Sequence, residues 1–332
     1  MHVIAKTLCL ASAAVLLACQ TNLLAQGANV PIEENQRSNN DAGLIAKAKA
    51  LKDAGKLVLD LDKAATALAK PTPEPVTLPP VSHERLEPEA IAATARKALM
   101  RVGWLCLCTR CDRWHLNLAG GYAIAADGVV ATCHHVVLPD KKSMREGYLV
   151  AADTAGQVYP VTGILAADKD MDIAIIRIDA QQLNALPIHD QSAPGAAAYL
   201  FSDPLGVAGY FSTGIVNRYY WKSRRKPVDA NTLKGARYLR MHVSTEWGPG
   251  SSGAAVLDCY ANVIGHVSMI SPRSYGEKGG KTEKSPPPPT PPDPEKRAAP
   301  PAHEPDQETI LVLHEAIPAR GLVLLLKAMK QE

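Results

Sequence analysis

The sequence lacks a strong net charge, and it lacks an apolar run long enough to cross a membrane. Lys and Arg total 36 against 33 Asp and Glu, and the formal charge of +3 is small for 332 residues. This balance gives no electrostatic reason to bind nucleic acid, so we expect no nucleic-acid partner. The apolar run within residues 1–25 is too short and too close to the start of the chain for a transmembrane helix.

The short run over residues 1–25 instead predicts export. Lys6 precedes an apolar stretch that ends in small residues, as in a secretory signal peptide. Two cleavage sites remain open. Leu16-Leu-Ala-Cys19 resembles a lipobox, which would leave Cys19 lipidated and the protein anchored to a membrane, whereas cleavage after Leu23-Leu-Ala25 would release it. We expect a protein of the periplasm or cell envelope, with secretion as the alternative.

Residues 26–70 are predicted to form an N-terminal helical segment. Apolar residues recur from Leu44 to Leu68 at heptad spacings, which Gly55 interrupts. Two interpretations stay open. The segment is either an amphipathic helix packed on the body of the protein or, over residues 42–70, a short stalk that forms homo-oligomers.

The rest of the chain predicts short strands. Prolines are dense over residues 71–85, which indicates a stiff, extended linker at a domain boundary. From Tyr148 to Tyr219, apolar runs alternate with Gly, Pro and Asp turns and no long helical pattern occurs, which is typical of an all-β barrel. We expect a short helix over residues 86–100 and a final helix over residues 318–331.

Three separated segments carry residues suited to nucleophilic catalysis. Gly248–Leu257 sets serines among glycines, in a loop that can turn backbone N–H groups toward one point. Upstream, a histidine pair ends Gly120–Val137, and an acidic loop opens Asp168–Ile178. A serine hydroxyl needs a base, and that base needs a group that fixes its tautomer. The order His, Asp, Ser disfavours an α/β-hydrolase, as does Ala254 where its elbow needs glycine.

These segments resemble the motifs of chymotrypsin-fold, trypsin-like serine proteases, closest to the bacterial HtrA/Deg group. Thr132-Cys-His-His-Val136 resembles Thr-Asn-x-His-Val, Asp172-Ile-Ala-Ile-Ile resembles Asp-Ile-Ala-Leu-Ile, and Gly250-Ser-Ser-Gly-Ala resembles Gly-Asn-Ser-Gly-Gly. The resemblance covers residues 88–330. It implies an all-β fold of two six-stranded antiparallel β-barrels, with an N-terminal helical extension and a C-terminal helix.

The resemblance also implies a domain plan. Residues 86–332 form one protease domain, with a first barrel over 86–183, a hinge near 183–187 and a second barrel over 187–332. Residues 272–308 are rich in Pro, Lys and Glu, have too few apolar residues to fold, and are expected to be a disordered insertion. We expect no PDZ domain after the barrels, so trimer assembly and PDZ-type substrate tethering are not carried over.

Roles follow residue by residue from the same resemblance. His135, Asp172 and Ser252 become the catalytic triad, chosen over the neighbouring histidine, aspartates and serine of each motif. The backbone N–H groups of Gly250 and Ser252 become the oxyanion hole. The hydroxyl of Ser268 is expected to support Asp172.

Substrate specificity is predicted less sharply. Glu246 occupies the position that lies at the base of the primary pocket in trypsin-like enzymes, where a carboxylate would favour Lys or Arg in the substrate. The alternative is a glutamate that faces solvent. Val267 and Met269 lie on the strand expected to form a pocket wall.

A cysteine-rich segment permits two interpretations. Cys106, Cys108, Cys111 and His115 are thiol and imidazole groups at short spacing, which suits tetrahedral zinc. An exported, oxidising setting favours disulfides instead. We expect a Cys108–Cys111 disulfide or free thiols, and no metal or other cofactor.

The sequence therefore predicts an exported serine endopeptidase that hydrolyses polypeptide substrates through an acyl-enzyme. One alternative is a catalytically weak, protease-like binding module of the cell envelope, because Ser251 and Ala254 replace an asparagine and a glycine of the family motif. Another is an enzyme that stays latent until the proline-rich insertion is displaced.

Overall fold

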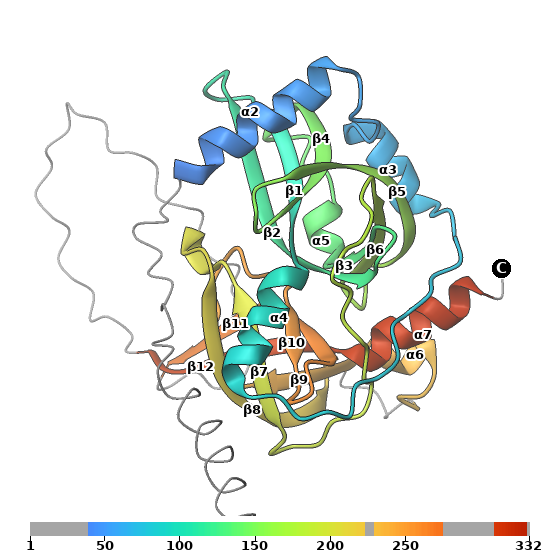
Figure 1. Cartoon of the computed structure of the whole chain (residues 1–332), viewed down its shortest axis with the longest axis vertical. Helices are drawn as coiled ribbons and strands as arrows, with labels where there is room; N and C mark the ends of the chain where they lie inside the picture. Colours follow the sequence, from blue (N-terminus) through green and yellow to red (C-terminus); the bar gives the residue numbers. More distant parts are fainter. Residues whose placement is uncertain (1–38, 223–228, 275–308, 331–332) are drawn as a thin grey trace, which may run out of the picture. The chain divides into compact units, whose positions relative to one another are not determined.

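The computed structural model describes residues 39–222, 229–274 and 309–330 (Figure 1). All of these residues belong to one compact unit, Arg37–Glu332. The predicted signal peptide over residues 1–25, the Cys19 lipidation site and residues 275–308 of the predicted insertion lie outside the described residues.

The first half of the chain forms a closed antiparallel barrel. Its strands are β1 (Leu99–Cys108), β2 (Trp114–Ala125), β3 (Val129–Thr132), β4 (Met144–Asp153), β5 (Val158–Asp168) and β6 (Ile173–Ile178), in the spatial order β1-β2-β3-β6-β5-β4. Alternation along β1 sends Val102, Trp104 and Cys106 into one buried cluster and Leu105 into another on the opposite face. The barrel interior is thus filled by every second residue.

The second half forms another closed antiparallel barrel. Its strands are β7 (Ala197–Ser202), β8 (Tyr210–Trp221), β9 (Leu239–Val243), β10 (Ala255–Leu257), β11 (Val263–Ser274) and β12 (Thr309–Pro318), in the order β10-β11-β12-β9-β8-β7. The predicted fold of two six-stranded barrels is confirmed. Residues 272–274 of the predicted insertion belong to β11. Ser274, the last residue of β11, pairs with Thr309, the first residue of β12.

The chain passes from one barrel to the other near Leu186. The Leu186 N–H donates to the carbonyl of Ala123 in the first barrel over 2.9 Å, and the next residue, Pro187, accepts from Val263 of the second barrel over 2.8 Å. An ion pair between Arg101 on β1 and Asp203 after β7 also joins the barrels.

The N-terminal segment forms two helices, α2 (Asn39–Asp53) and α3 (Leu61–Ala69), so the prediction of one heptad helix is wrong. The chain turns at Gly55, whose φ of +69° is a conformation that glycine adopts without strain. Leu44 and Ala48 of α2 are buried in a cluster with Leu105 and Val150 of the barrel. Packing on the barrel uses the apolar residues that a stalk would need.

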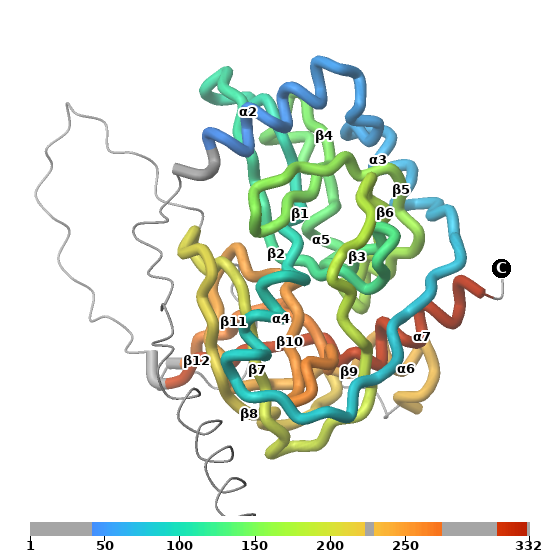
Figure 2. Tube along the Cα trace, viewed as in Figure 1, coloured from blue at the N-terminus to red at the C-terminus, as the bar shows by residue number. Residues whose placement is uncertain are grey.

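The proline-dense segment is extended, as predicted, but it is bonded to both barrels. It runs from α3 to α4 (Pro88–Ala98) (Figure 2). The Thr72 N–H donates to the Ile164 carbonyl over 3.0 Å in the first barrel, and the Ser82 N–H donates to Asn262 Oδ1 over 2.8 Å in the second. The segment is therefore a strap across the barrels.

Short helices complete the fold: α5 (His134–Val137), the 3₁₀ turn η1 (Pro204–Gly206), α6 (Leu233–Ala236) and α7 (Ala319–Met329). The C-terminal helix α7 packs on β5 of the first barrel and on β11 of the second. Over the ranges that the structure describes, no helix has both the length and the apolar character needed to cross a membrane.

Candidate active site

The imidazole of His135 is held by the carboxylate of Asp172. His135 lies on α5, directly after β3, and Asp172 lies in the turn between β5 and β6. Nδ1 of His135 is 2.9 Å from Oδ2 and 3.0 Å from Oδ1 of Asp172, and the His135 backbone N–H donates to Oδ1 over 3.0 Å. This pairing directs the other ring nitrogen, Nε2, away from the carboxylate.

The carboxylate itself is fixed and ionised. Asp172 has a φ of +57°, a left-handed conformation that aspartate tolerates better than most side chains. Ser268 Oγ on β11 donates to its Oδ2 over 3.0 Å. Burial opposes ionisation of Asp172, but the hydrogen bonds and charge of His135, together with Ser268, outweigh it and lower its pKa to about 2.

The loop that bears Ser252 is pressed against the strand that leads to His135. A Cβ on Gly253 would lie 2.4 Å from the Gly120 carbonyl oxygen and 2.5 Å from Thr132 Oγ1. Only glycine fits there, and its φ of +85° also requires glycine. Thr132 in turn donates to the Gly120 carbonyl over 2.6 Å, so β2, β3 and the serine loop are joined at one point.

Two backbone N–H groups of this loop are free to bind a ligand. The N–H groups of Ser251, Gly253 and Ala254 all donate to carbonyls within 3.1 Å. Those of Gly250 and Ser252 have no acceptor within residues 229–274 or in the rest of the described chain. The two N–H groups that have no acceptor, those of Gly250 and Ser252, are the ones that the sequence predicts for an oxyanion hole.

Ser252 and His135 are both accessible. The His135 side chain is 49% exposed, and Ser252 is half-buried. Among the described residues, the Ser252 hydroxyl has no hydrogen-bond partner, so Ser252 and His135 are not bonded to each other in this structure. Hydrogen bonds of this kind often form only when a substrate is bound.

The two departures from the family motif are accommodated locally. Ser251 is fully buried, and its hydroxyl pairs with that of Ser202 over 3.0 Å. Ala254 is also fully buried, against Gly120, where a Cβ would come within 2.9 Å of the alanine Cβ. The extra methyl group therefore fits because residue 120 is a glycine.

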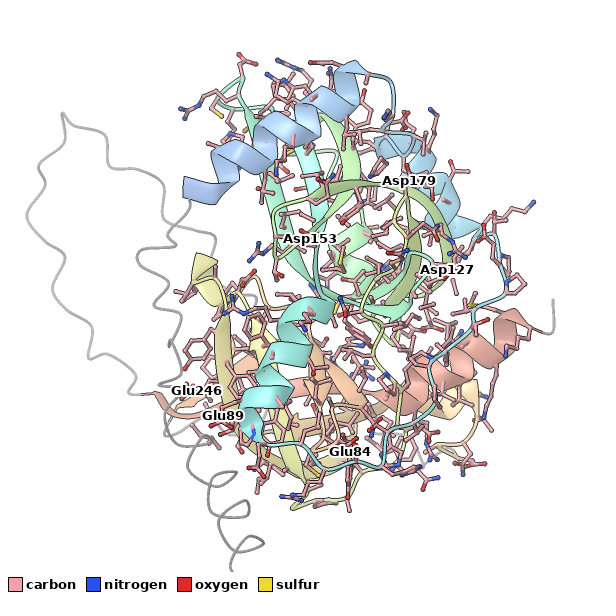
Figure 3. The ribbon with its side chains drawn as sticks, in the orientation of Figure 1. Glu84, Glu89, Asp127, Asp153, Asp179 and Glu246 are labelled. Atoms are coloured by element: carbon pink, nitrogen blue, oxygen red, sulfur yellow. The ribbon has the colours of Figure 1, made fainter. Side chains whose placement is uncertain are left out.

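Glu246 does not lie at the base of an enclosed pocket. Its side chain is exposed (Figure 3), and Oε2 accepts from the Tyr210 hydroxyl over 2.5 Å. This is the solvent-facing alternative. Val267 is buried, with its carbonyl bonded to the Gly253 N–H over 2.8 Å, whereas Met269 on the same strand is 41% exposed. Met269 is thus the more accessible of the two predicted wall residues.

The neighbouring acids and histidine have other environments. Asp168 is buried and pairs with Arg237 over 2.8 Å, and the Asp170 carbonyl accepts from Arg240 over 2.8 Å. These bonds hold the turn that presents Asp172. Burial lowers the pKa of His134, which is therefore held neutral beside the site.

Two buried residues near the site, His266 and Cys133, are not among those predicted from the sequence. His266 Nε2 lies 3.4 Å from the Asp172 carbonyl oxygen, and burial lowers the pKa of the ring to about 4. Cys133 donates its thiol hydrogen to the Val267 carbonyl over 3.1 Å, and burial followed by the charge of Asp172 raises its pKa well above 9.0. A thiol held protonated is not a nucleophile, so Cys133 is a wall of the site.

Of the two predicted alternatives, a Cys108–Cys111 disulfide or free thiols, the structure has free thiols at all five cysteines in the described ranges. Cys111 Sγ is directed to His115 Nε2, 2.9 Å away, and Cys108 Sγ accepts from the Arg110 N–H over 3.4 Å. The backbone N–H of Arg113 is the main cause that lowers the pKa of Cys111.

Comparison with known proteins finds similar peptidases. A family model described as a trypsin-like peptidase domain matches residues 119–265. A probable periplasmic serine endoprotease, DegP-like, of Halomonas elongata is 26% identical over 168 residues, which are 49% of this chain and 31% of that protein. A protein of the same description from Ectopseudomonas mendocina is 25% identical over 165 residues, again 49% of this chain and 31% of that protein.

Among solved structures, the serine endoprotease from Yersinia pestis matches 75% of this chain and 69% of its own, with a TM-score of 0.47 and 15% identity. The chain spans about a third of the length of the curated relatives, since the match covers 31% of each. The peptidase model runs from β2 into β11 and includes His135, Asp172 and Ser252. Residues 119–265 thus match a trypsin-like peptidase domain within a fold of two six-stranded antiparallel barrels, and about half of the chain is similar in sequence to DegP-like endoproteases.

Proposed function

We propose that this protein is an exported serine endopeptidase that cleaves polypeptides through an acyl-enzyme. The observation that carries the proposal is the hydrogen bonding between Asp172 and His135, with both carboxylate oxygens within 3.0 Å of Nδ1. This pairing fixes the tautomer in which Nε2 accepts a proton. With Nε2 of His135 able to accept a proton, the hydroxyl of Ser252 in the neighbouring loop can act as a nucleophile.

In the proposed mechanism, Ser252 Oγ attacks the carbonyl carbon of the scissile peptide bond while His135 Nε2 takes the hydroxyl proton. The imidazolium then gives this proton to the leaving amine. Water, activated by the same nitrogen, hydrolyses the acyl-enzyme and regenerates the serine. The free N–H groups of Gly250 and Ser252 stabilise the oxyanion of each tetrahedral intermediate.

Asp172 serves this cycle as a permanent anion. A pKa of about 2 keeps the carboxylate ionised at neutral pH, so it stabilises the positive imidazole each time His135 is protonated. The Ser268 hydroxyl and the His135 backbone N–H hold the carboxylate so that it faces the ring. Neither group takes part in proton transfer.

Labelling with a fluorophosphonate probe tests the proposal. The full chain should react at one residue, Ser252, identified by mass spectrometry, and Ser252→Ala should abolish the reaction. Ser251→Ala is the matched control, because it removes the adjacent buried hydroxyl and should still label. An unreactive chain, in spite of the 49% exposure of His135, would instead indicate the protease-like binding module.

Export is part of the proposal. It is supported by the apolar run over residues 1–25 and by the periplasmic description of the DegP-like relatives. With the lipobox used, the mature chain begins at a lipidated Cys19 and fractionates with membranes, and Cys19→Ala moves it to the soluble fraction. A wild-type chain found soluble, with its N-terminus after Ala25, would exclude the anchor.

A further inference from the structure

Metal-binding side chains converge at the tip of the β1–β2 hairpin, apart from the catalytic residues. Cys108 ends β1, Cys111 lies in the connecting loop and His115 lies on β2. Their ligand atoms all lie within 4.8 Å of one another, and Cys111 Sγ is 2.9 Å from His115 Nε2. Three soft donors thus already meet at one point.

The strand register adds a fourth donor on the same side. Cys106 and His115 are paired residues of β1 and β2, so their side chains project to the same face of the hairpin. Cys108 is two residues further along β1 and shares that face. Cys106 is buried in the core of the first barrel, and its Sγ accepts from Asn117 Nδ2 over 3.7 Å.

The loop is shaped to present its sulfur atoms. The Cys108 N–H donates to the Arg113 carbonyl over 3.0 Å and closes the hairpin. Within it, the Arg110 backbone N–H donates to Cys108 Sγ over 3.4 Å. An N–H donor of this kind stabilises the negative charge that a thiolate ligand carries.

We propose that Cys108, Cys111 and His115, with Cys106 as the fourth ligand, bind a zinc ion. Thiolate and imidazole donors in a four-residue set are typical of closed, structural zinc sites. On binding, the three thiols lose their protons to solvent and His115 binds as the neutral ring, so no oxidant or reductant takes part. The ion would fasten the open tip of the hairpin to the buried end of the first barrel.

A second cluster near the active site is the main competitor for a metal. Cys133, His135 and Asp172 also have ligand atoms within 4.8 Å of one another. There, however, the Asp172 oxygens are engaged by His135 and Ser268, and the Cys133 thiol donates to a carbonyl. A metal there would have to break the bonds that hold Asp172 against His135. At the hairpin it would replace only the Cys111–His115 contact and the long Asn117–Cys106 contact.

Cobalt titration of the full, reduced and chelator-treated chain tests the proposal. About one Co²⁺ per chain should bind with the visible and thiolate charge-transfer absorption of a tetrahedral sulfur site. Changes at outer-shell residues cost about 10- to 100-fold in metal affinity, so Cys106→Ser, Cys111→Ser and His115→Gln should each weaken binding by at least that much. Cys133→Ser and Cys259→Ser should leave both affinity and spectrum unchanged.

Contrary outcomes are equally definite. A spectrum that survives Cys111→Ser but is lost in Cys133→Ser would assign the metal to the active site and overturn the proposal. Full affinity in Cys106→Ser would overturn the four-residue set. A Cys108–Cys111 disulfide, found by non-reducing peptide mapping of protein isolated from the producing cells, would overturn the metal site altogether. If a cysteine variant fails to fold, zinc content and melting temperature are measured on His115→Gln with and without chelator. Loss of zinc and of the effect of chelator on melting temperature would support the site, and wild-type values would contradict it.

Discussion

Gly253 and Thr132 approach so closely that no side chain fits between them: a Cβ on Gly253 would lie 2.5 Å from Thr132 Oγ1. The glycine follows the proposed nucleophile, and the threonine ends the strand that leads to the proposed base. One contact therefore sets the distance between the serine loop and the histidine. Catalysis should be sensitive to it.

Gly253→Ala should abolish fluorophosphonate labelling and destabilise the fold. The added methyl group meets backbone and Thr132 atoms, and the φ of +85° costs about 1–3 kcal/mol for a residue with a side chain. The measurement is urea unfolding together with the labelling rate. Gly43→Ala is the control, since nothing lies within 4 Å of its Cβ position and alanine is the better helix former. Equal stability of the two variants would contradict the close contact.

Asp172→Asn should lower kcat for a peptide substrate by about 10⁴-fold with little change in KM, because the amide favours the wrong imidazole tautomer. The expected fold is unchanged, as circular dichroism would check. Asp170→Asn is the matched control, since only the backbone carbonyl of that residue is used, by Arg240. A similar loss in both variants would show that the turn, rather than the carboxylate, is what matters.

The ionisation of Asp172 should make stability fall in acid. Its pKa is lowered from 3.8 to about 2, so the folded state binds this proton less readily than the unfolded chain does. The contribution is complete above about pH 4 and is lost as the pH falls toward 2. Urea unfolding between these limits should show a smaller pH dependence for Asp172→Asn than for the wild type. Identical slopes would mean that the carboxylate is not held as described.

Ser268→Ala should lower kcat by about fivefold, which corresponds to one hydrogen bond of about 1 kcal/mol. The serine supports Asp172 without touching substrate, so the effect should appear in kcat and not in KM. The acid limb of the stability profile should also shift upward, because the pKa of Asp172 rises when a donor is lost. Rescue by Ser268→Thr, with no rescue by Ser268→Val, would separate the hydroxyl from packing.

The strap over residues 70–87 should detach when its anchor on the second barrel is removed. Asn262 is fully buried, accepts from the Ser82 N–H and donates to the Ser82 carbonyl and to Asp258. Asn262→Ala leaves those groups unpaired, at a cost of about 1–3 kcal/mol. Limited proteolysis within the strap should accelerate, whereas exposed Asn184→Ala should cut at the wild-type rate. No change in either rate would argue against the anchor.

The pairing of His135 with Asp172 could be predicted from the sequence, but only through the resemblance, which selects Asp172 over Asp168. The structure gives the physical difference between the two acids: Asp168 is buried on Arg237, while Asp172 faces His135. The free N–H groups of Gly250 and Ser252 were also predictable, since they depend on the local turn of a glycine-rich loop.

What could not be predicted depends on packing between distant segments. The heptad spacing from Leu44 to Leu68 was real, but Gly55 and the barrel surface divide it into two helices. The environment of Glu246 depends on Tyr210, whose hydroxyl donates to its carboxylate. The environment of His266 on β11 depends on Asp172, which lies in the β5–β6 turn of the first barrel. None of these partners is adjacent in sequence.

The pairing of Ser274 with Thr309 has a consequence for how this chain tolerates change. Ser274 and Thr309 are neighbours in the sheet, so connections of different lengths can join them, and the entropy cost of joining two strand ends grows only slowly with the length of the connection. Lengthening, shortening or exchanging residues 275–308 should therefore leave both barrels intact. That position is the natural point at which to graft an affinity tag or a reporter onto this protein.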